Sequence, residues 1–484
     1  MILGVPIDDV STEEAVDLIT RMMSSGRPHY FATANVDFLV QAQQDPELHR
    51  ILLDADLVVC DGSPVLWASR LLGNPLRERI AGADLVPLLL RVAAQRRLRV
   101  FLLGAAPESL ARAAARLGRE YPGLIIAGDY SPPFAPLLDM DHAVIADRVR
   151  EARPDLLLVA FGCPKQEKWI SMHCRALGVP VSAGIGASID FLSGHMRRAP
   201  VWLQRFGLEW AFRLLQEPRR LFSRYAKDFR VFGWMLLAQY IQLRRHANQA
   251  GAPASGAVIS DSEGLQFVRW PARLDATSIL RDPILKTDAI ANGRDCVLDL
   301  AAVQSIDSAG LGFLIGLRRD IRSRGRQLVL LAPSPVVVRA LQLMHLDGAF
   351  PKVPDVAAAR NLIEERHRQR TQPVPDSVAP DGSVVWRGEL TAMNCESFWL
   401  PTRAYAEAHA QVGGALSIDL SDLHFIDSAG LLLMKHTKAA AQRLGTQVEF
   451  RKPSSTVRRI ARLAGVERSL FNPGDGPMRD ARPL

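Results

Sequence analysis

Short runs of aliphatic and β-branched residues alternate with amphipathic stretches over the first part of the chain, up to about residue 195. Continuous apolar runs are typical of strands buried on both faces of a parallel sheet, and the amphipathic stretches are typical of the helices that cover it. The pattern therefore predicts a Rossmann-like α/β fold. Strands are expected at residues 29–33, 57–60, 98–103, 124–127, 156–161 and 180–183, and helices at 12–24, 37–53, 63–72, 85–95, 107–119, 143–152 and 164–177.

The second half of the chain carries an internal repeat. Residues 307–311 and 427–431 both read Asp-Ser-Ala-Gly-Leu, and each copy follows an apolar run and opens a helix-like stretch. A spacing of 120 residues is too long for a solenoid repeat and fits a duplicated small domain. We therefore expect two small α/β modules, called repeat 1 and repeat 2, after a larger N-terminal domain.

Composition predicts where these parts begin and end. Stretches rich in small residues, polar residues and proline separate the N-terminal domain from repeat 1, and repeat 1 from repeat 2, as linkers do. The predicted parts are residues 1–246 for the N-terminal domain, with a helical basic appendage at 197–246, 247–263 for the first linker, 264–366 for repeat 1, 367–383 for the second linker, 384–473 for repeat 2 and 474–484 for a disordered tail.

Cysteine content and hydropathy exclude several classes of protein. Five scattered cysteines without a Cys-x-x-Cys pair argue for a reducing compartment and against a disulfide framework or a structural zinc site. No signal peptide is expected, because the start of the chain lacks a charged leader followed by an apolar segment. The best candidate for a membrane span, residues 231–241, has about half of the ~20 residues that a transmembrane helix needs.

Positive charge is concentrated in the basic appendage. Eleven Lys and Arg residues stand against three acidic ones between residues 197 and 245, interleaved with Trp and Phe, in a chain of net charge +8. Such a segment suits a lipid headgroup interface, and the alternative is an amphipathic helix packed on its own domain. No nucleic-acid partner is expected, because no recognised nucleic-acid fold accompanies the charge.

Polar residues follow several predicted strands, at the edge where open α/β sheets bind ligands. They are Thr33, Asn35, Asp61, Gly104 and Gln166. Asp61 can take a proton from an acceptor hydroxyl, or it can cap the helix that follows. Gly104 belongs to a strand–turn–helix connection that can seat a phosphate on backbone N–H groups or serve as a plain loop.

A second candidate site lies in a proline-rich loop. Asp139 and Asp141 form an Asp-x-Asp pattern, which can hold a divalent ion on a nucleotide diphosphate. Alternatively, Arg77, Arg79 and the arginines of the appendage neutralise the diphosphate, since guanidinium groups suit phosphate geometry. Alternatively, each of these arginines lies on a solvated helix face and binds no ligand.

Together, these segments resemble the WecG/TagA/CpsF family of bacterial glycosyltransferases. Its members transfer a sugar from a nucleotide diphosphate donor, usually a UDP-sugar, to an undecaprenyl-diphosphate-linked acceptor, with inversion and without a metal. The resemblance covers essentially residues 1–230, and the matching segments are residues 4–8, 33–35, 55–57, 61–62, 78–82, 162–169, 184–190, 198–200, 207–210 and 217–220.

The resemblance implies roles for residues at the edge of the sheet. Asp61 looks like the general base, and Thr33 and Asn35 look like contacts of the donor or the acceptor. Arg79 and Gln166 look like groups that hold the sugar and the diphosphate. The resemblance implies no metal or other cofactor, which weighs against the metal interpretation of the Asp-x-Asp pattern.

The appendage also fits the family. Arg213 and Arg220 match arginines of a basic tail that closes over the site and helps the enzyme meet the membrane. A further family arginine falls on Ser223, so the register of the tail departs from the family pattern. The resemblance thus implies a peripheral position on the inner face of the cytoplasmic membrane.

Both repeats resemble STAS domains, the family of anti-sigma-factor antagonists and transporter tails. The matching feature is Asp-Ser-x-Gly-Leu after a strand, followed by a helix and a further strand. In antagonist proteins a partner kinase phosphorylates that serine, which corresponds to Ser308 and Ser428 here. The alternative is that Asp and Ser only cap the helix, and a kinase or another signalling protein is the implied partner.

The sequence therefore predicts a metal-independent inverting glycosyltransferase of exopolysaccharide or cell-envelope polysaccharide synthesis. It is expected to move a hexose or an N-acetylhexosamine from a UDP-sugar to a polyprenyl-diphosphate-linked acceptor, with the repeats serving regulation or docking. The alternative is a STAS-based partner-switching scaffold whose N-terminal domain binds a sugar nucleotide without catalysis. The joint presence of the five candidate site residues that the family resemblance singles out disfavours such a degenerate domain.

Overall fold

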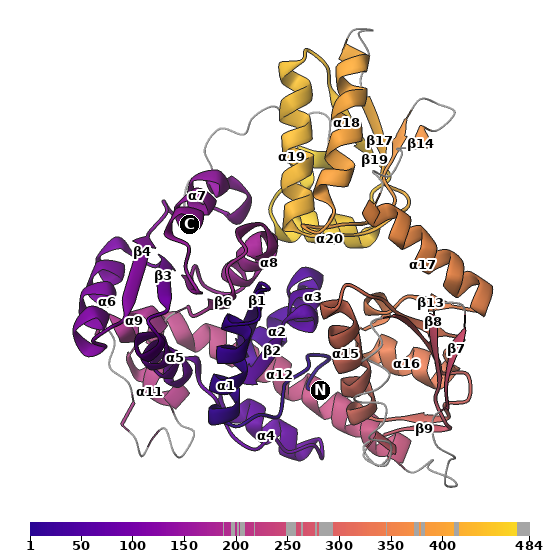
Figure 1. The fold of residues 1–484 in the computed structure, drawn as a ribbon. Coiled ribbons are helices and arrows are strands. Elements are labelled where there is room, and N and C mark those ends of the chain that lie inside the picture. Colours follow the sequence, from indigo (N-terminus) through magenta and orange to yellow (C-terminus); the bar gives the residue numbers. More distant parts are fainter. Residues whose placement is uncertain are drawn as a thin grey trace.

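The computed structural model describes residues 1–186, 188–194, 199, 200, 203, 209–216, 218–247, 258–262, 265–275, 278, 279, 294–344, 346–371, 377, 378, 383–410 and 416–471. They form three bodies, which are the N-terminal domain and the two repeats (Figure 1). Repeat 1, drawn in rose to orange-brown, and repeat 2, drawn in orange to yellow, both lie on the side of the N-terminal domain that carries helix α3 (Pro46–Asp54).

The N-terminal domain is built on a six-stranded sheet with the order β2-β1-β6-β5-β3-β4. Every neighbouring pair of strands runs parallel, which confirms the predicted α/β fold class. The strands are β1 (His29–Ala34), β2 (Leu57–Cys60), β3 (Arg99–Gly104), β4 (Ile125–Tyr130), β5 (Leu156–Ala160) and β6 (Val181–Gly184).

Helices cover both faces of this sheet. Side chains alternate along each strand, so β2 sends Leu57 and Val59 to one core and Val58 and Cys60 to the other. The first core is covered by α1 (Thr12–Met23), α5 (Gly82–Arg96), α6 (Pro107–Glu120) and α9 (Ser188–Leu192). The opposite face is covered by α2 (Val36–Gln44), α3, α4 (Ser63–Leu71), α7 (His142–Ala152), which follows the short helix η1 (Leu137–Asp139), and α8 (Lys165–Leu177).

The stretch predicted as one helix at residues 37–53 forms two helices, α2 and α3. Asp45 is extended, with φ −114° and ψ 99°, because the residue before a proline is pushed out of the helical region. Its Oδ1 accepts hydrogen bonds from Glu47 N at 3.0 Å and Leu48 N at 3.2 Å. Asp45 therefore caps α3 and makes it a separate helix.

The basic appendage contributes two described helices, α11 (Glu209–Gln216) and α12 (Pro218–Ala247), which meet at the interruption predicted at Pro218. α12 packs on α2, where Phe232 is buried and Gln239 Oε1 accepts a hydrogen bond from Leu3 N at 3.0 Å. Most of the stretch from 195 to 208 lies outside the described residues. No helix in the described part of the chain has the length and hydropathy needed to cross a membrane.

The two repeats share one plan. The main sheet has the order β13-β12-β10-β8-β7 in repeat 1 and β14-β15-β17-β19 in repeat 2, and each repeat adds a short parallel pair, β9 with β11 and β16 with β18. Repeat 1 comprises β7 (Val258–Ser262), β8 (Leu265–Arg269), β9 (Arg273–Leu274), β10 (Asp295–Asp299), β11 (Ser305–Ile306), α15 (Ser308–Ser323), β12 (Leu328–Leu331), α16 (Pro335–Leu343), η2 (Asp347–Ala349), β13 (Lys352–Val353) and α17 (Val356–Thr371). Repeat 2 comprises β14 (Ser377–Val378), β15 (Val384–Val385), β16 (Gly388–Leu390), α18 (Cys395–Ala410), β17 (Leu416–Asp419), β18 (Leu423–Ile426), α19 (Ser428–Arg443), β19 (Val448–Arg451), α20 (Ser455–Leu463) and α21 (Glu467–Phe471).

The repeated Asp-Ser-Ala-Gly segment starts a helix in both modules. Asp307 and Asp427 cap α15 and α19 by accepting hydrogen bonds from Gly310 N at 2.8 Å and Gly430 N at 2.9 Å. A Cβ atom on Gly310 would lie 2.1 Å from a backbone oxygen of β9, and one on Gly430 would lie 2.8 Å from a backbone oxygen of β16. Glycine therefore lets α15 start directly against β9 and α19 directly against β16.

Two strands lie in stretches that the sequence predicts as linkers. β7 falls within residues 247–263 and pairs antiparallel with β8, and β14 falls within residues 367–383 and pairs antiparallel with β15. These short strands carry a weak local pattern, because their conformation is set by the neighbour with which they pair. The tail predicted at 474–484 lies outside the described residues.

Candidate active site

Asp61 lies at the carboxyl edge of the sheet, directly after β2. Its backbone N–H donates to Ala34 O at 2.9 Å, and its half-buried carboxylate has Oδ2 3.5 Å from Gly82 N, at the start of α5. The following helix, α4, has Gly62 as its N-cap and no side-chain cap, so the capping interpretation of Asp61 is wrong. The N-terminus of α5 favours a negative charge at this position, as a general base requires.

Two hydroxyl groups lie close to the same helix start. A Cβ atom on Gly82 would lie 3.2 Å from Thr33 Oγ1 and 3.7 Å from Ser188 Oγ. The end of β1, the end of β2 and the turn after β6 therefore converge on the N-terminus of α5. Thr33, which the sequence predicts as a ligand contact, is thus brought together with Asp61.

Asn35 caps α2 at the same edge of the sheet. Its Oδ1 accepts a hydrogen bond from Phe38 N at 3.1 Å. Its Cβ lies 4.0 Å from the point that a Cβ on Gly62 would occupy, so the cap stands beside the turn that follows Asp61. The cap orients the amide of Asn35, and its contact with donor or acceptor stays a prediction.

Gly104 ends β3 in a left-handed turn with φ 97°. A Cβ atom there would lie 2.7 Å from the Phe161 ring and 2.8 Å from Ala160 O. Both the backbone angle and the crowding therefore require glycine. The predicted strand–turn–helix connection is present, since α6 begins at Pro107, and its contact with a phosphate stays a prediction.

Arg79 joins the sheet domain to the appendage. Its guanidinium group lies 3.0 Å from Glu209 Oε2 on α11 and 3.5 Å from Asp84 Oδ2 on α5, and the side chain is 17% exposed. A diphosphate would therefore share Arg79 with these carboxylates. Arg77 instead pairs with Glu14 at 2.6 Å, on the exposed surface.

Gln166 is buried and connects the turns that follow β5 and β6. Its Oε1 accepts hydrogen bonds from Gly162 N and Gly186 N, both at 3.1 Å, and its Nε2 donates to Glu167 Oε1 at 2.7 Å. Burial raises the pKa of Glu167 to about 7. These bonds fix two loops at the ligand-binding edge, while direct contact of Gln166 with sugar or diphosphate stays a prediction.

The remaining predicted residues lie elsewhere or outside the described side chains. Arg213 and Arg220 have their backbones in α11 and α12, and their side chains are not among those described. Asp139 pairs with Lys435 of repeat 2 at 2.5 Å, and Asp141 caps α7 at Val144 N. Among the residues that the structure describes, no group of three or more His, Cys, Asp or Glu side chains gathers as metal ligands do.

A family model described as the glycosyl transferase WecG/TagA/CpsF family matches residues 1–246. The chain belongs to this family. The predicted family and the predicted class of enzyme, a glycosyltransferase, are thereby confirmed. A STAS domain model matches residues 277–359, and a model described as Mlab, STAS domain, matches residues 379–472. Both repeats are therefore STAS domains, as predicted.

Curated relatives match the N-terminal domain of this glycosyltransferase. An N-acetylglucosaminyldiphosphoundecaprenol N-acetyl-beta-D-mannosaminyltransferase of Bacillus spizizenii is 37% identical over 214 residues, which cover 44% of this chain and 81% of that protein. Proteins of the same name from Bacillus subtilis and Staphylococcus aureus are 36% and 29% identical, and the matches cover 39% and 46% of this chain and 72% and 85% of those proteins.

Solved structures match a smaller part of the chain. An anti-sigma-factor antagonist (STAS) domain protein from Planctomyces limnophilus is 19% identical with a TM-score of 0.21, covering 23% of this chain and 99% of that one. The anti-sigma factor antagonist SpoIIAA in its unphosphorylated form is 18% identical with a TM-score of 0.20, covering 22% of this chain and 96% of that one.

Ser188 and Lys168 both lie in segments that resemble the family, but neither is predicted as a site residue from the sequence. Ser188 follows a glycine-containing turn after the last strand, which is a signal for a ligand-binding edge. Lys168 is 6% exposed, and a lysine in an amphipathic helix gives no local sign of burial. Its acidic partners, Asp45 and Glu47, lie far away along the chain.

Proposed function

We propose that the protein transfers a hexose or an N-acetylhexosamine from a UDP-sugar to an undecaprenyl-diphosphate-linked acceptor, with inversion and without a metal ion. The observation that carries this proposal is the Asp61 carboxylate at the ligand-binding edge of a WecG/TagA/CpsF domain, beside Thr33 and the start of α5. The names of the relatives, which specify an N-acetylglucosaminyldiphosphoundecaprenol acceptor and an N-acetylmannosaminyl group, support the acceptor class. Such a product belongs to exopolysaccharide or cell-envelope polysaccharide synthesis.

Inversion follows from a single displacement. The acceptor hydroxyl attacks the anomeric carbon from the face opposite the diphosphate, and the bond from that carbon to the diphosphate oxygen breaks as the new glycosidic bond forms. Asp61 takes the hydroxyl proton, which raises the nucleophilicity of the attacking oxygen. Negative charge grows on the departing UDP, and guanidinium groups and backbone N–H groups at helix starts stabilise it.

Other residues of the edge position the reactants. The Thr33 and Ser188 hydroxyls are placed to bind sugar hydroxyls near Asp61, and the turn at Gly104 presents the start of α6 to a phosphate. Gln166 holds the loops after β5 and β6 in one arrangement. Arg79 reaches the diphosphate by exchanging a carboxylate partner for a phosphate oxygen.

A defined assay tests the activity and the metal independence together. The full-length protein is incubated with a panel of UDP-sugars and synthetic polyprenyl-diphosphate N-acetylglucosamine, and products are detected by mass spectrometry. We expect one or a few donors to give a product, and a chelator to leave the rate within about twofold, because a carboxylate base needs no metal. Absence of product with every pair contradicts the proposal, and a chelator effect reversed by Mg²⁺ or Mn²⁺ restores the metal interpretation of Asp139 and Asp141.

The acceptor lipid requires that the enzyme reach a membrane surface, and α12 has an outer face suited to it. At about 100° per residue, one face of α12 carries apolar side chains together with Arg219 and Arg230, opposite the buried Phe232 and Gln239. We propose that this face lies in the headgroup region of the inner leaflet, on the cytoplasmic side. Its apolar residues are Trp234, Leu237 and Ile241, which are 73%, 49% and 41% exposed, and Phe222, 66% exposed, lies at its margin.

We expect Trp234→Ser to weaken binding to vesicles that contain anionic phospholipid by about tenfold, since a large apolar side chain contributes on the order of 1.5–3 kcal/mol when it is buried. Co-sedimentation with vesicles of anionic and of neutral lipid measures the effect. Val144→Ser is the matched control, because Val144 is 40% exposed on α7, away from this face. Equal binding of the two variants would contradict a membrane role for α12.

A further inference from the structure

Ser308 and Ser428, the serines of the repeated Asp-Ser-Ala-Gly-Leu segment, both contact the N-terminal domain, and they bind different groups there. In repeat 2, Ser428 N donates to Glu47 Oε1 at 2.6 Å and Ser428 Oγ donates to Glu47 Oε2 at 2.8 Å. In repeat 1, Ser308 Oγ accepts a hydrogen bond from the side-chain amide of Asn74. Both serines are buried, with exposures of 1% and 3%. One serine therefore binds a carboxylate, and the other binds a neutral amide.

The carboxylate that binds Ser428 belongs to a buried charge cluster of the N-terminal domain. Glu47 is 2% exposed and lies in the first turn of α3, and its Oε2 is 2.9 Å from Lys168 Nζ. Lys168 also pairs with Asp45, the cap of α3, at 2.7 Å. Lys168 stands on α8, whose start carries the 162–166 turn of the candidate active site. Ser428, Glu47 and Lys168 therefore form a continuous series of contacts from repeat 2 to α8, the helix that follows this turn.

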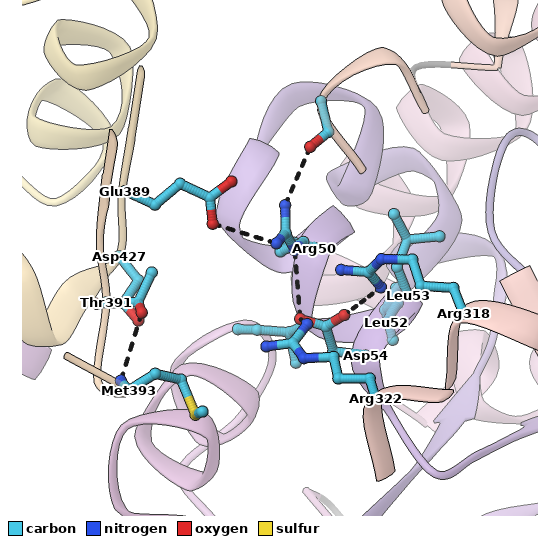
Figure 2. A network of polar contacts seen from close by, with 12 residues as sticks. Arg50, Leu52, Leu53, Asp54, Arg318, Arg322, Glu389, Thr391, Met393 and Asp427 are labelled. Atoms are coloured by element: carbon cyan, nitrogen blue, oxygen red, sulfur yellow. Dashed lines mark hydrogen bonds and ion pairs between the residues drawn. The ribbon is translucent and has the colours of Figure 1, made fainter. Parts of the chain in front are cut away.

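Polar contacts surround this pair of residues and hold repeat 2 in place. Arg459 donates to Gln44 O at 2.8 Å, and Lys435 binds Asp139 at 2.5 Å. Arg50, on α3, forms an ion pair with Glu389 of repeat 2 (Figure 2), and its Nη2 is 3.3 Å from Glu389 Oε2. Beside these contacts is a cavity of about 540 Å³ lined by all three bodies. Repeat 2 therefore meets the N-terminal domain at α3 through polar contacts and at η1, where Leu138 also packs with the buried apolar cluster of repeat 2.

Negative charge is already crowded around Ser428. Asp427, the cap of α19, lies next to it in the chain, and burial together with the Glu47 carboxylate raises the pKa of Asp427 to about 7. The positive charge of Lys168 is shared between Asp45 and Glu47. A further anion on Ser428 Oγ would meet the Glu47 carboxylate at hydrogen-bonding distance, where like charges repel strongly because the contact is buried.

We propose that the first turn of α3 is the docking partner of repeat 2 within this chain, and that negative charge on Ser428 releases repeat 2 from it. The surface around Ser428 is a carboxylate-binding surface, formed by a helix N-terminus and a serine hydroxyl, and Glu47 occupies it. Repeat 1 does not share this sensitivity, because the side-chain amide of Asn74 carries N–H groups that can donate to an anion on Ser308.

Phosphorylation is one source of such charge. A protein kinase transfers the γ-phosphoryl group of a nucleoside triphosphate to Ser428 Oγ, the bond from that phosphorus to the nucleoside diphosphate breaks, and the hydroxyl proton passes to a base of the kinase or to water. Ser428 is 1% exposed while repeat 2 is docked, so the kinase reaches it only after repeat 2 has left α3. Docking on Glu47 and phosphorylation of Ser428 therefore exclude each other.

The test compares Ser428→Asp with Ser308→Asp in the full-length protein. Small-angle X-ray scattering measures the radius of gyration, and hydrogen exchange measures protection in the first turn of α3. For Ser428→Asp we expect a larger radius and protection in that turn reduced by about tenfold or more, because the turn becomes exposed. For Ser308→Asp we expect the radius and this protection to match the unaltered protein. An unchanged radius in Ser428→Asp, or equal release in both variants, overturns the proposal.

Two further variants separate release from misfolding. Adding Glu47→Gln to Ser428→Asp replaces the repelling carboxylate by an amide that can donate to the new aspartate, so docking is expected to return. If Ser428→Asp loses exchange protection in β17, repeat 2 itself has unfolded. In that case the single variant Glu47→Lys is the deciding test. It removes the carboxylate on α3 and leaves repeat 2 unaltered, so it should release an intact repeat 2. Continued docking of Glu47→Lys overturns the proposal, and none of these measurements requires sugar transfer.

Discussion

Replacing Asp61 by asparagine lowers the rate of sugar transfer by about a hundredfold to ten-thousandfold, which is the usual contribution of a positioned general base. Asparagine has almost the shape of aspartate, and its oxygen can still accept from Gly82 N, 3.5 Å away in the native protein. The start of α5 therefore keeps its partner, and only the proton acceptor is lost. The turnover number at saturating donor and acceptor, measured by mass spectrometry, checks the expectation.

Binding of the UDP-sugar should distinguish the loss of a base from a loss of structure in Asp61→Asn. We expect the affinity of Asp61→Asn for the UDP-sugar, measured by calorimetry, to stay within a few fold of the native value. Asp56→Asn is the control at the opposite end of β2, where Asp56 binds His29 and Tyr30 N, far from the reacting edge. Near-native turnover in Asp61→Asn would reject Asp61 as the base, whatever the control does.

Replacing Asp54 by asparagine should weaken the attachment of repeat 1 by about 3–5 kcal/mol, the usual cost of removing one partner of a buried ion cluster. Asp54, at the end of α3, lies 2.5 Å from both Arg318 and Arg322 of repeat 1 (Figure 2). Burial alone would raise the pKa of Asp54, but Arg318, Arg322 and Arg50 outweigh it and hold the pKa well below its usual range. Burial also lowers the pKa of Arg318 to about 10, so Arg318 is poorly solvated and depends on Asp54.

Native-state hydrogen exchange of α15 in increasing urea measures this attachment. Asp147→Asn is the matched control, because it removes an exposed carboxylate that pairs with Arg150 on the surface of α7, a kind of pair worth about 0–1 kcal/mol. Acid should act like the variant. The lowered pKa of Asp54 gives a stabilisation that is complete above about pH 4, the ordinary range of an aspartate, and is lost as the pH falls below it. Equal losses in the two variants would show that the cluster does not hold repeat 1.

The fold of the N-terminal domain was predictable because its strands are buried on both faces. Runs such as residues 57–60 are apolar throughout and are followed directly by a polar residue, here Asp61. The strand and its ligand-binding end can therefore both be located in the sequence. The division of residues 37–53 into α2 and α3 was missed because the apolar period continues across Asp45. The Asp-Pro pair at 45–46 was the available signal.

The candidate site was predictable to a similar depth. Thr33 lies near the end of β1, Asn35 and Asp61 each follow a strand, and parallel strands bring their carboxyl ends to one edge. The ion pair of Arg79 was not predictable, because its partner Glu209 is 130 positions away. Neither was the docking of the repeats, since Glu47 and Ser428 are 381 positions apart and nothing in the first turn of α3 indicates a partner.

Arg50 connects both modules to the N-terminal domain. Its guanidinium group serves both of them, because it lies 3.3 Å from Glu389 of repeat 2 and donates to Gly348 O of repeat 1 at 3.2 Å. It also pairs with Asp54, the residue that anchors repeat 1. Departure of either module therefore removes one partner of this guanidinium group. The two modules share one cation, so their attachments to α3 are coupled through it.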